Sequence, residues 1–494
     1  MDLFVRIHPS DNVAVALSVI PANTTVTIDS ITLTTREEIP AGHKVALTDL
    51  PEGAQVIKYG YSIGYTKTFV PAGSHIHVHN IHTGLSGTLE YTWNPVKTEL
   101  EPRQPATFPG FPRRSGRVGI RNELWIIPTV GCVNDIARTL ERKAQQFVGG
   151  SVDSILAFSH PYGCSQMTED QENTRHILAD LCMHPNAGGV LLLGLGCENS
   201  GIDIIKQYLD ENACERIRYL VCQQVEDEME AGLSLIQELA EEMQTDQRVP
   251  CPASKLVVGL KCGGSDGFSG ITANPVIGGF SDILISQGGS TILTEVPEMF
   301  GAETILMNRC ASEAVFEKTV HLINDFKKYF EDHHQTIYEN PSPGNKAGGI
   351  STLEDKALGC TQKSGSATVT DVLKYAERVQ TPGLNLLSAP GNDLVASTAL
   401  AAAGAQMVLF STGRGTPFAS PVPTVKIASN PRIAAWKHNW IDFSAGRLLE
   451  GGHSLPELSQ ELFDLVLSVA GGQKVCSEEH GFHDLAIFKT GVTL

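Results

Sequence analysis

Residues 190–197 read VLLLGLGC, an apolar run that ends in a cysteine. Runs of this kind recur along the chain, and their recurrence indicates the fold class. The other segments of this form are 124–132 (LWIIPTVGC), 155–164 (ILAFSHPYGC), 219–222 (YLVC) and 256–262 (LVVGLKC). Continuous apolar strands separated by helical stretches are typical of a parallel sheet covered on both faces. We therefore predict an α/β body built on parallel strands from about residue 116 onward.

The body divides into two regions, 116–250 and 251–494, because a second set of strands follows the first. These further strands are expected at 283–286, 384–388, 407–411 and 425–428. Ligands of open parallel sheets bind at the carboxyl ends of the strands. If the five cysteine-ending strands lie side by side, their thiols face one crevice.

Residues 1–90 form a separate β module. Its expected strands are 13–16, 45–47 and 75–79, and its turns are 20–23 (IPAN), 39–42 (IPAG), 50–53 (LPEG) and 70–73 (VPAG). Proline presets the second position of a β-turn, and Gly or Asn tolerates the conformation that closes it. Residues 91–115 carry five prolines and are interpreted as an extended linker.

The composition limits the partners and the compartment. The 494 residues carry a formal net charge of −18, which repels phosphate backbones and anionic lipid, so neither nucleic acid nor a membrane is an expected partner. The start of the chain lacks a secretory signal, and no apolar window is long enough for a membrane helix, which favours a cytoplasmic protein. Homo-oligomerisation stays open.

The eleven cysteines contain no C-x-x-C pair, which argues against a zinc ribbon or a thioredoxin-like pair. The strand-end cysteines are interpreted first as structural and second as lining a site. An iron–sulfur cluster is not expected because the chain has no closely spaced cysteine group. NAD is not expected either, since segment 194–201 (GLGCENSG) departs from the dinucleotide-binding glycine spacing.

Polar residues at strand ends predict a site for a polyhydroxylated anion. Gln166 and Asn199 follow strand-end cysteines, and Asn392 and Arg414 stand in later loops. Segment 261–267 (KCGGSDG) includes Gly264 and Ser265 in a turn whose backbone N–H groups could hold an anion. Arg414 is a natural bidentate partner for a carboxylate, although a structural ion pair explains it equally well.

The histidine-rich segment 74–80 (SHIHVHN) is the best candidate for a metal site. On a strand, residues two apart share a face and lie roughly 6.6 Å apart, so His77 and His79 could bind one ion. His8, Asp11 or a sheet cysteine would complete the ligand set. Histidines at the mouth of a cleft, with no metal, are the alternative.

Long motifs resemble the altronate and galactarate dehydratase family of sugar-acid lyases over essentially the whole chain. Among the matching segments are GHKVALTD (42–49), GIRNELWIIPTVGCVN (119–134), HPNAGGVLLLGLGCEN (184–199), KCGGSDGFSGITANP (261–275) and ENPSPGNKAGGISTLEDKALGCTQKSG (339–365). The resemblance implies an N-terminal β-clip of the SAF type joined to a large α/β body of Rossmann-like parallel-sheet regions. It also implies activation by a divalent metal, iron(II) or manganese(II).

The resemblance is strongest to the altronate-dehydrating members, and it implies a hydro-lyase that converts D-altronate to 2-keto-3-deoxy-D-gluconate in hexuronate catabolism. Such chemistry needs a base and an acid, for which we select Lys261 or His160 and Glu198 or Asp266 respectively. The predicted substrate-binding residues are Asn80, Gln166, Asn199, Gly264, Ser265, Asn392 and Arg414. Galactarate dehydration, sulfolactate lysis and non-catalytic binding of a sugar acid are the alternatives.

Overall fold

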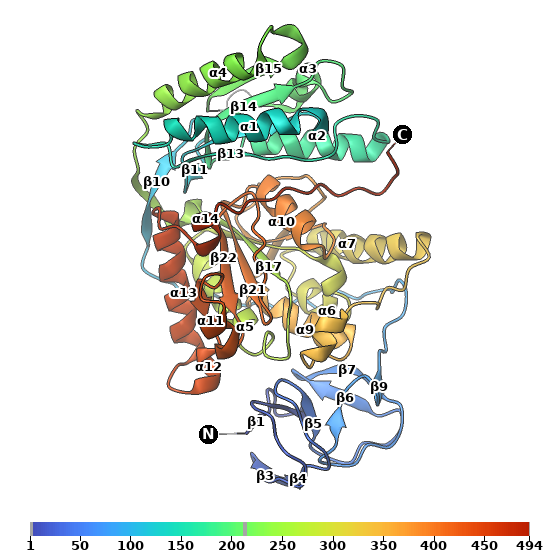
Figure 1. Ribbon diagram of the computed structural model, residues 1–494. Helices are drawn as coiled ribbons and strands as arrows, with labels where there is room; N and C mark the ends of the chain where they lie inside the picture. The colour runs from blue at the N-terminus through green and yellow to red at the C-terminus, as the bar shows by residue number, and fades with distance from the viewer. Residues whose placement is uncertain (1–2, 211–214, 494) are drawn as a thin grey trace.

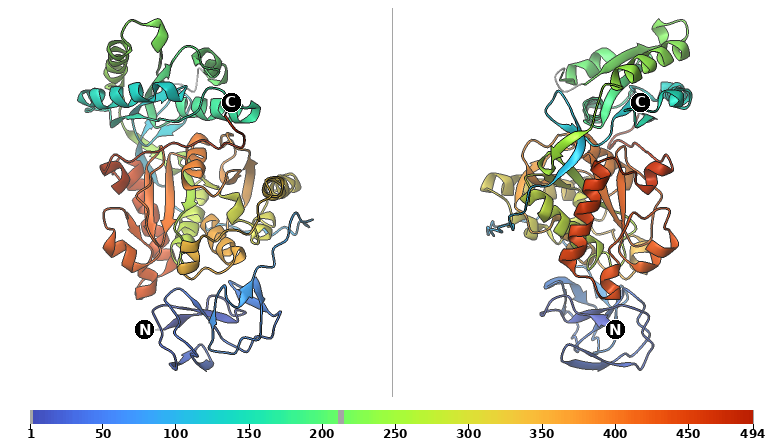
Figure 2. Two further views of the ribbon diagram at one scale, coloured as in Figure 1. Left: turned by 45° about the vertical axis from the view of Figure 1, so that its right-hand side comes forward. Right: turned by 90° about the vertical axis from the view of Figure 1, so that its left-hand side faces the viewer.

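The computed structural model describes residues 3–210 and 215–493. Figure 1 shows three parts in a row: a small β domain with the N-terminus, a unit around a seven-stranded sheet, and a unit around a four-stranded sheet. The turned views of Figure 2 keep the seven-stranded unit in the middle. The predicted fold class, a small β domain joined to a mixed α/β body with parallel sheets, is confirmed.

The N-terminal domain contains short antiparallel strands. They are β1 (Phe4–Val5), β2 (Val13–Ala16), β5 (Lys44–Ala46) and β8 (His75–Ile76) in one sheet, the hairpin β3 (Thr25–Ile28) and β4 (Ile31–Thr34), and β6 (Gln55–Lys58), β7 (Tyr61–Thr66) and β9 (Ile81–His82) in a third sheet. The closing residues of the four predicted turns, Asn23, Gly42, Gly53 and Gly73, all have a positive φ. This is the backbone region that Asn and Gly tolerate best.

The predicted strand 75–79 is wrong beyond Ile76. The chain turns at His77, where the N–H of Asn80 donates to the carbonyl of His77 at 3.0 Å. The Asn80 side chain holds this turn, because it accepts from His77 N at 3.0 Å and donates to His75 O at 2.8 Å. His77 and His79 therefore do not share the face of one strand.

Part of the expected linker is a strand. β10 (Thr107–Pro112) pairs with β11 (Val118–Gly119) and with β16 (Val249–Pro252). Burial alternates from Thr107 to Gly110, and Phe111 is buried as well, so both Phe108 and Phe111 are covered while Thr107 and Pro109 are exposed. The prolines predicted an extended segment, but its pairing with β16 depends on a partner far away in the sequence.

The four-stranded unit has the sheet order β13-β12-β14-β15, with all strands parallel. Its elements are β12 (Glu123–Pro128), α1 (Asn134–Ala144), β13 (Ser154–Ala157), α2 (Thr168–Cys182), β14 (Ala187–Gly194), α3 (Ile202–Ile205), β15 (Ile217–Val221) and α4 (Glu228–Met243). β14 is buried over its whole length, as its apolar sequence predicts. Helices α1 and α4 pack together in one core of the unit, and α2 lies in another.

The seven-stranded unit has the parallel order β19-β20-β18-β17-β21-β22-β23. The strands are β17 (Val257–Cys262), β18 (Ser290–Leu293), β19 (Val369–Leu373), β20 (Gly383–Leu387), β21 (Met407–Thr412), β22 (Thr424–Ala428) and β23 (Phe443–Ser444). The helices are α5 (Ala273–Ser286), α6 (Glu303–Met307), α7 (Glu313–Asp332), α8 (Pro343–Ala347), α9 (Leu353–Thr361), α10 (Asp393–Ala402), α11 (Pro431–Trp436), α12 (Arg447–Glu450), α13 (Leu455–Ala470) and α14 (Cys476–Glu479).

The predicted strand 283–286 is wrong, because these residues form the last turn of α5. Apolar residues such as Val276, Phe280 and Ile283 are buried along the helix, which is covered on several sides. A short apolar run of this kind cannot be distinguished from a strand by periodicity alone. The true strand, β18, begins at Ser290.

The five cysteine-ending strands do not form one sheet. β12 to β15 belong to the four-stranded sheet, whereas β17, which ends at Cys262, belongs to the seven-stranded sheet. The expectation of a single crevice for all five thiols is therefore wrong. Within residues 3–210 and 215–493, no helix combines the length and apolarity needed to cross a bilayer.

Candidate active site

The N-terminal domain docks on the seven-stranded unit through two lysines that share one carboxylate. Lys44 Nζ donates to Asp355 Oδ2 at 2.8 Å, and Lys58 Nζ donates to Asp355 Oδ1 at 2.9 Å. Lys44 Nζ also donates to Gly349 O at 2.7 Å. The three charged side chains are at most 2% exposed. Asp355 lies in the first turn of α9, so this contact fixes the N-terminal domain against that helix.

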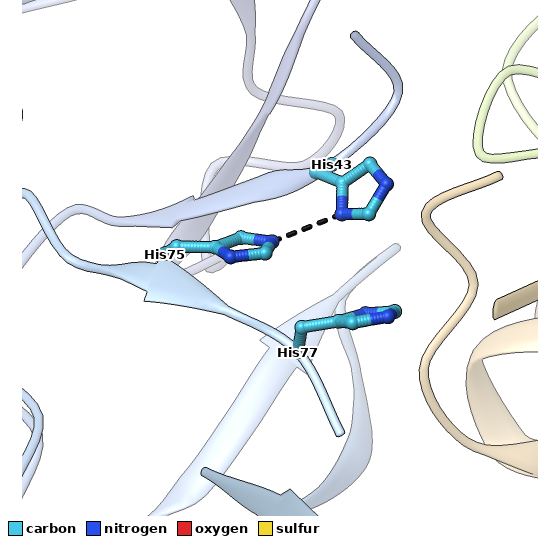
Figure 3. A group of neighbouring side chains, drawn as sticks. All are labelled: His43, His75 and His77. Carbon is cyan, nitrogen blue, oxygen red and sulfur yellow. Dashed lines mark hydrogen bonds between the residues drawn. The ribbon is translucent and has the colours of Figure 1, made fainter. Parts of the chain in front are cut away.

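Three histidines of the N-terminal domain gather beside this contact (Figure 3). His43 precedes β5, His75 begins β8, and His77 stands in the turn that follows. His43 Nδ1 lies 2.9 Å from His75 Nε2, and the ring centroids of His43 and His77 are 4.9 Å apart. One ring nitrogen of each histidine lies within 4.8 Å of the others, which is close enough for one metal ion to bind all three.

The lowered pKa values of these three histidines favour metal binding. Burial, helped by the neighbouring His43 and His77, lowers the pKa of His75 to about 3, and burial with Lys44 lowers the pKa of His77 to about 4. Burial also lowers the pKa of His43. Neutral imidazole is the form that binds metals. His77 Nδ1 is buried and has no hydrogen-bond partner among the described residues, as expected of a ligand atom.

The group differs from the predicted pair of His77 and His79. The ring of His79 lies 5.4 Å from that of His75, much closer than an extended strand allows, yet His79 is not part of the group. His8 bonds to Ser10, and Asp11 accepts from backbone N–H groups, and neither is in the group. His43 is the third member of the group. It was not predicted, because its partner His75 lies 32 residues further along the chain.

Cys262, Glu298 and Cys360 form a second group of potential metal ligands among the described residues. The two sulfurs are 3.5 Å apart, and both lie within 3.3 Å of Glu298 Oε2. Two ammonium groups already neutralise this cluster. Lys363 Nζ is 2.9 Å from Cys262 Sγ, and Lys356 Nζ is 2.8 Å from Glu298 Oε1. Since these charges repel a cation, the histidine group is the better candidate.

A cavity of about 590 Å³ lies beside the docked N-terminal domain. Ala41 and Gly348 line it, and the adjoining Ala347 carbonyl is 3.4 Å from His43 Nε2. Asp266 and Arg414 also line it, so two residues predicted from the sequence meet at one place. The cavity therefore combines a cation and a carboxylate close to the histidine group.

The loop after β17 positions these two side chains. Gly264, with φ of +63°, accepts from Arg414 N at 3.1 Å, and the buried Ser265 carbonyl accepts from Asn345 at 2.8 Å. Asp266 accepts from the hydroxyl of Ser429 at 2.8 Å. Burial raises the pKa of Asp266, although hydrogen bonds to its carboxylate oppose this effect.

Lys261 and Asn392 are both held by contacts within the fold. Lys261 Nζ is fully buried, pairs with Glu295 and lies 2.9 Å from Asp393 Oδ1. Burial alone would lower the pKa of Lys261, but Glu295 and Asp393 outweigh it and raise that pKa. An ammonium held in this way is a poor base. Asn392 caps α10 through the N–H groups of Leu394 and Val395.

His160, Glu198, Gln166 and Asn199 belong to the four-stranded unit, which lies at the other end of the molecule from the histidine group (Figures 1 and 2). His160 is buried, bonds to Pro128 O at 2.7 Å, and has its pKa lowered by burial to about 4. Glu198 accepts from Thr129 at 2.6 Å. The predicted acid–base set is therefore split between two places in this chain, and only Asp266 lines the cavity.

Comparisons with known proteins agree with this architecture. Three family models match in succession: the altronate/galactarate dehydratase SAF domain at residues 2–84, the second domain of D-galactarate dehydratase/altronate hydrolase at 110–244, and the C-terminal domain of D-galactarate/altronate dehydratase at 253–493. The N-terminal domain is thus of the predicted SAF type.

Relatives match along their whole length. Altronate dehydratase of Escherichia coli (strain K12) is 54% identical over 99% of this chain and 100% of its own. Altronate dehydratase of Bacillus subtilis (strain 168) is 54% identical over 100% of both chains. Galactarate dehydratase (L-threo-forming) of Escherichia coli (strain K12) is 32% identical over 98% of this chain and 96% of its own. The chain belongs to the D-galactarate/altronate dehydratase family and is a hydro-lyase.

Proposed function

We propose that the chain dehydrates D-altronate to 2-keto-3-deoxy-D-gluconate, a step of hexuronate catabolism. The observation that carries the chemistry is the group of His43, His75 and His77 beside a cavity lined by Asp266 and Arg414. The choice of substrate rests on identity, which is 54% to two altronate dehydratases and 32% to a galactarate dehydratase.

The three histidines would hold the divalent metal that the family suggests, iron(II) or manganese(II). When bound, such an ion supplies a Lewis acid that makes the proton next to a carboxylate easier to remove. In the reaction, a base takes the proton from C2, and the C3 hydroxyl takes up a proton and leaves as water. The resulting enol loses its hydroxyl proton and gains a proton at C3 to become the 2-keto acid. Arg414 would bind the substrate carboxylate, and Asp266 would protonate the leaving hydroxyl.

The proposed setting is the cytoplasm. The cysteines of the described residues are all free, as a reducing compartment keeps them. The net charge of −18 gives no support to a nucleic-acid or membrane partner. An anionic sugar acid therefore needs a local cation, and Arg414 in the cavity lining would supply it. Assembly into a homo-oligomer is part of the same proposal.

A side-by-side assay tests the substrate. We expect iron(II)-supplemented, anaerobically purified protein to release the keto acid from D-altronate, with a kcat/KM well above that for galactarate or sulfolactate. Equal or better turnover of galactarate or sulfolactate would reject altronate. Saturable binding of altronate with no product would instead favour a binding protein.

Arg414→Ala should weaken substrate binding. A charge-assisted bidentate contact contributes about 1.5–3 kcal/mol, so kcat/KM should fall about 10- to 100-fold, mostly through KM. Steady-state kinetics on D-altronate measures this change. Arg138→Ala, on the exposed face of α1, is the control and should behave as wild type. An unchanged KM in Arg414→Ala would remove this arginine from the binding site.

A further inference from the structure

Three loops of the four-stranded unit share one sequence form, in which glycine and cysteine are followed two residues later by a side-chain amide. The loops are 131–134 (GCVN) after β12, 163–166 (GCSQ) after β13 and 196–199 (GCEN) after β14. The strands are parallel, so Cys132, Cys164 and Cys197 stand at the same edge of one sheet. The proposed dehydration leaves this repeated form unexplained.

The strand register places the three cysteines at matching heights. Pro128 and Leu193 are paired across β12 and β14, and Cys132 and Cys197 each follow four residues later. Ile126 pairs with Ala157 of β13, and Cys164 follows Ala157 by seven residues. Neighbouring strands lie about 4.8 Å apart, so the outer two of these three strands are about 10 Å apart, and all three loops leave the sheet at the same edge.

Hydrogen bonds connect the three loops, or the residues directly next to them, in all three pairings. Gly131 N donates to Tyr162 O at 2.9 Å, which joins the first loop to the second. Ser200 N donates to Gly163 O at 3.1 Å, which joins the third loop to the second. Thr129 Oγ1 donates to Glu198 at 2.6 Å, which joins the first to the third. β12 lies between β13 and β14 in the sheet. The loop that follows β13 therefore passes over the carboxyl end of β12 to reach the loop that follows β14.

The amides of the repeated form fix these loops. Asn134 Nδ2 donates to His160 O at 2.9 Å, and Gln166 Oε1 accepts from Gly163 N at 3.1 Å. Asn199 Oδ1 accepts from Ser165 N at 3.0 Å and from Cys164 Sγ at 3.3 Å. The amides therefore hold the backbone around the thiols, which is the supporting structure that a preorganised metal centre needs.

The thiols themselves are accessible. Cys132 and Cys197 are exposed and Cys164 is partly exposed, although cysteine is among the residues most often buried. Cys222, at the end of the neighbouring β15, is different: it is buried, it lacks the preceding glycine, and burial raises its pKa to about 11. The exposure of Cys132, Cys164 and Cys197 is therefore particular to these three loops, because the strand-end Cys222 does not share it.

We propose that Cys132, Cys164 and Cys197 bind a cubane iron–sulfur cluster of the [4Fe–4S] type, with the fourth iron left for a non-cysteine ligand. Cysteine thiolates are the usual ligands of such clusters. Parallel strands bring these three cysteines to one sheet edge although they are far apart in the sequence, which the spacing of the cysteines could not show. The cluster with its thiolates is anionic, and α1 and α2 both start within four residues of a ligand, so their N-termini face negative charge. This site lies apart from the histidine group and does not depend on the proposed function.

Cluster transfer tests the proposal. Anaerobic protein is mixed with a synthetic [4Fe–4S] complex of small thiolates and then desalted. In this exchange, three of the four bonds from iron to a small thiolate break as three bonds to cysteine sulfurs form, and three small thiols leave with the cysteine protons. The fourth iron keeps a non-cysteine ligand, and no electron is transferred. Wild-type protein should gain iron and acid-labile sulfide in equal amounts, together with the visible absorption of the cluster.

The matched variants are Cys132→Ser, Cys164→Ser and Cys197→Ser, each of which should lose most of the bound iron and sulfide. Cys222→Ser is the control and should retain both. Retention of sulfide by all three variants, or equal loss in the control, would overturn the proposal, as would wild-type protein that retains no acid-labile sulfide.

A second measurement covers variants that fold poorly. Wild-type protein with and without the cluster is treated with iodoacetamide, and the labelled cysteines are identified by mass spectrometry. The cluster should protect Cys132, Cys164 and Cys197, while labelling of the partly exposed Cys476 stays unchanged. Equal labelling of the three thiols in both samples would reject their role as ligands.

Discussion

His43→Ala is expected to lower kcat/KM on D-altronate about a thousand-fold, because a catalytic metal contributes several kcal/mol and each 1.4 kcal/mol is a factor of ten. His43 Nδ1 lies 2.9 Å from His75 Nε2 and its ring lies 4.9 Å from that of His77, so its loss removes one of three ligands. Anaerobic kinetics with saturating iron(II) measures the effect.

His79→Ala is the matched control for this prediction. It removes a histidine from the same segment, two residues from His77 and with its ring 5.4 Å from that of His75, but outside the ligand group. We expect its activity to stay close to that of wild type and its iron content to be unchanged, whereas His43→Ala should bind iron weakly. Equal losses in the two variants would contradict the assignment of His43 and restore the pair of His77 and His79.

The difference between these two histidine sets shows what local sequence can predict. Alternation along a strand placed His77 and His79 on one face, but Asn80 folds the chain back after Ile76. The side chain of Asn80 competes with strand formation here, as asparagine often does in turns. His43 enters the group through the pairing of β5 with β8, and that pairing is a long-range contact that no local pattern contains.

The same limit applies to the α/β body. The apolar runs predicted β12, β14, β17 and β21 well, because a buried parallel strand is mostly apolar along its length. They could not indicate which strands share a sheet. Glu198 and Asp266 both follow strand ends, yet β14 and β17 belong to different sheets, so the two carboxylates serve different places. Asp266 and Arg414 do meet, since β17 and β21 are neighbours.

Asp355→Asn is expected to destabilise the protein by about 3–5 kcal/mol, since it leaves the charges of Lys44 and Lys58 buried without a counter-ion. Both ammonium groups lie within 2.9 Å of this carboxylate, and neither is more than 2% exposed. The loss should appear as a lower midpoint in urea unfolding. Asp332→Asn is the control: its partner Lys328 is 65% exposed, and water and salt screen such surface pairs, so the midpoint should not move.

The contribution of Asp355 should also depend on pH. Burial alone would raise the pKa of Asp355, but Lys44 and Lys58 outweigh it and hold that pKa well below its usual range. A carboxyl whose folded-state pKa is depressed stabilises the protein above the unfolded-state pKa of about 3.9, and this contribution is lost as the pH falls from there. The gap in unfolding free energy between wild type and Asp355→Asn should therefore shrink below about pH 4. A gap that stayed constant down to the acid transition would mean that Asp355 stabilises the docked domain through packing and hydrogen bonds alone, and not through its charge.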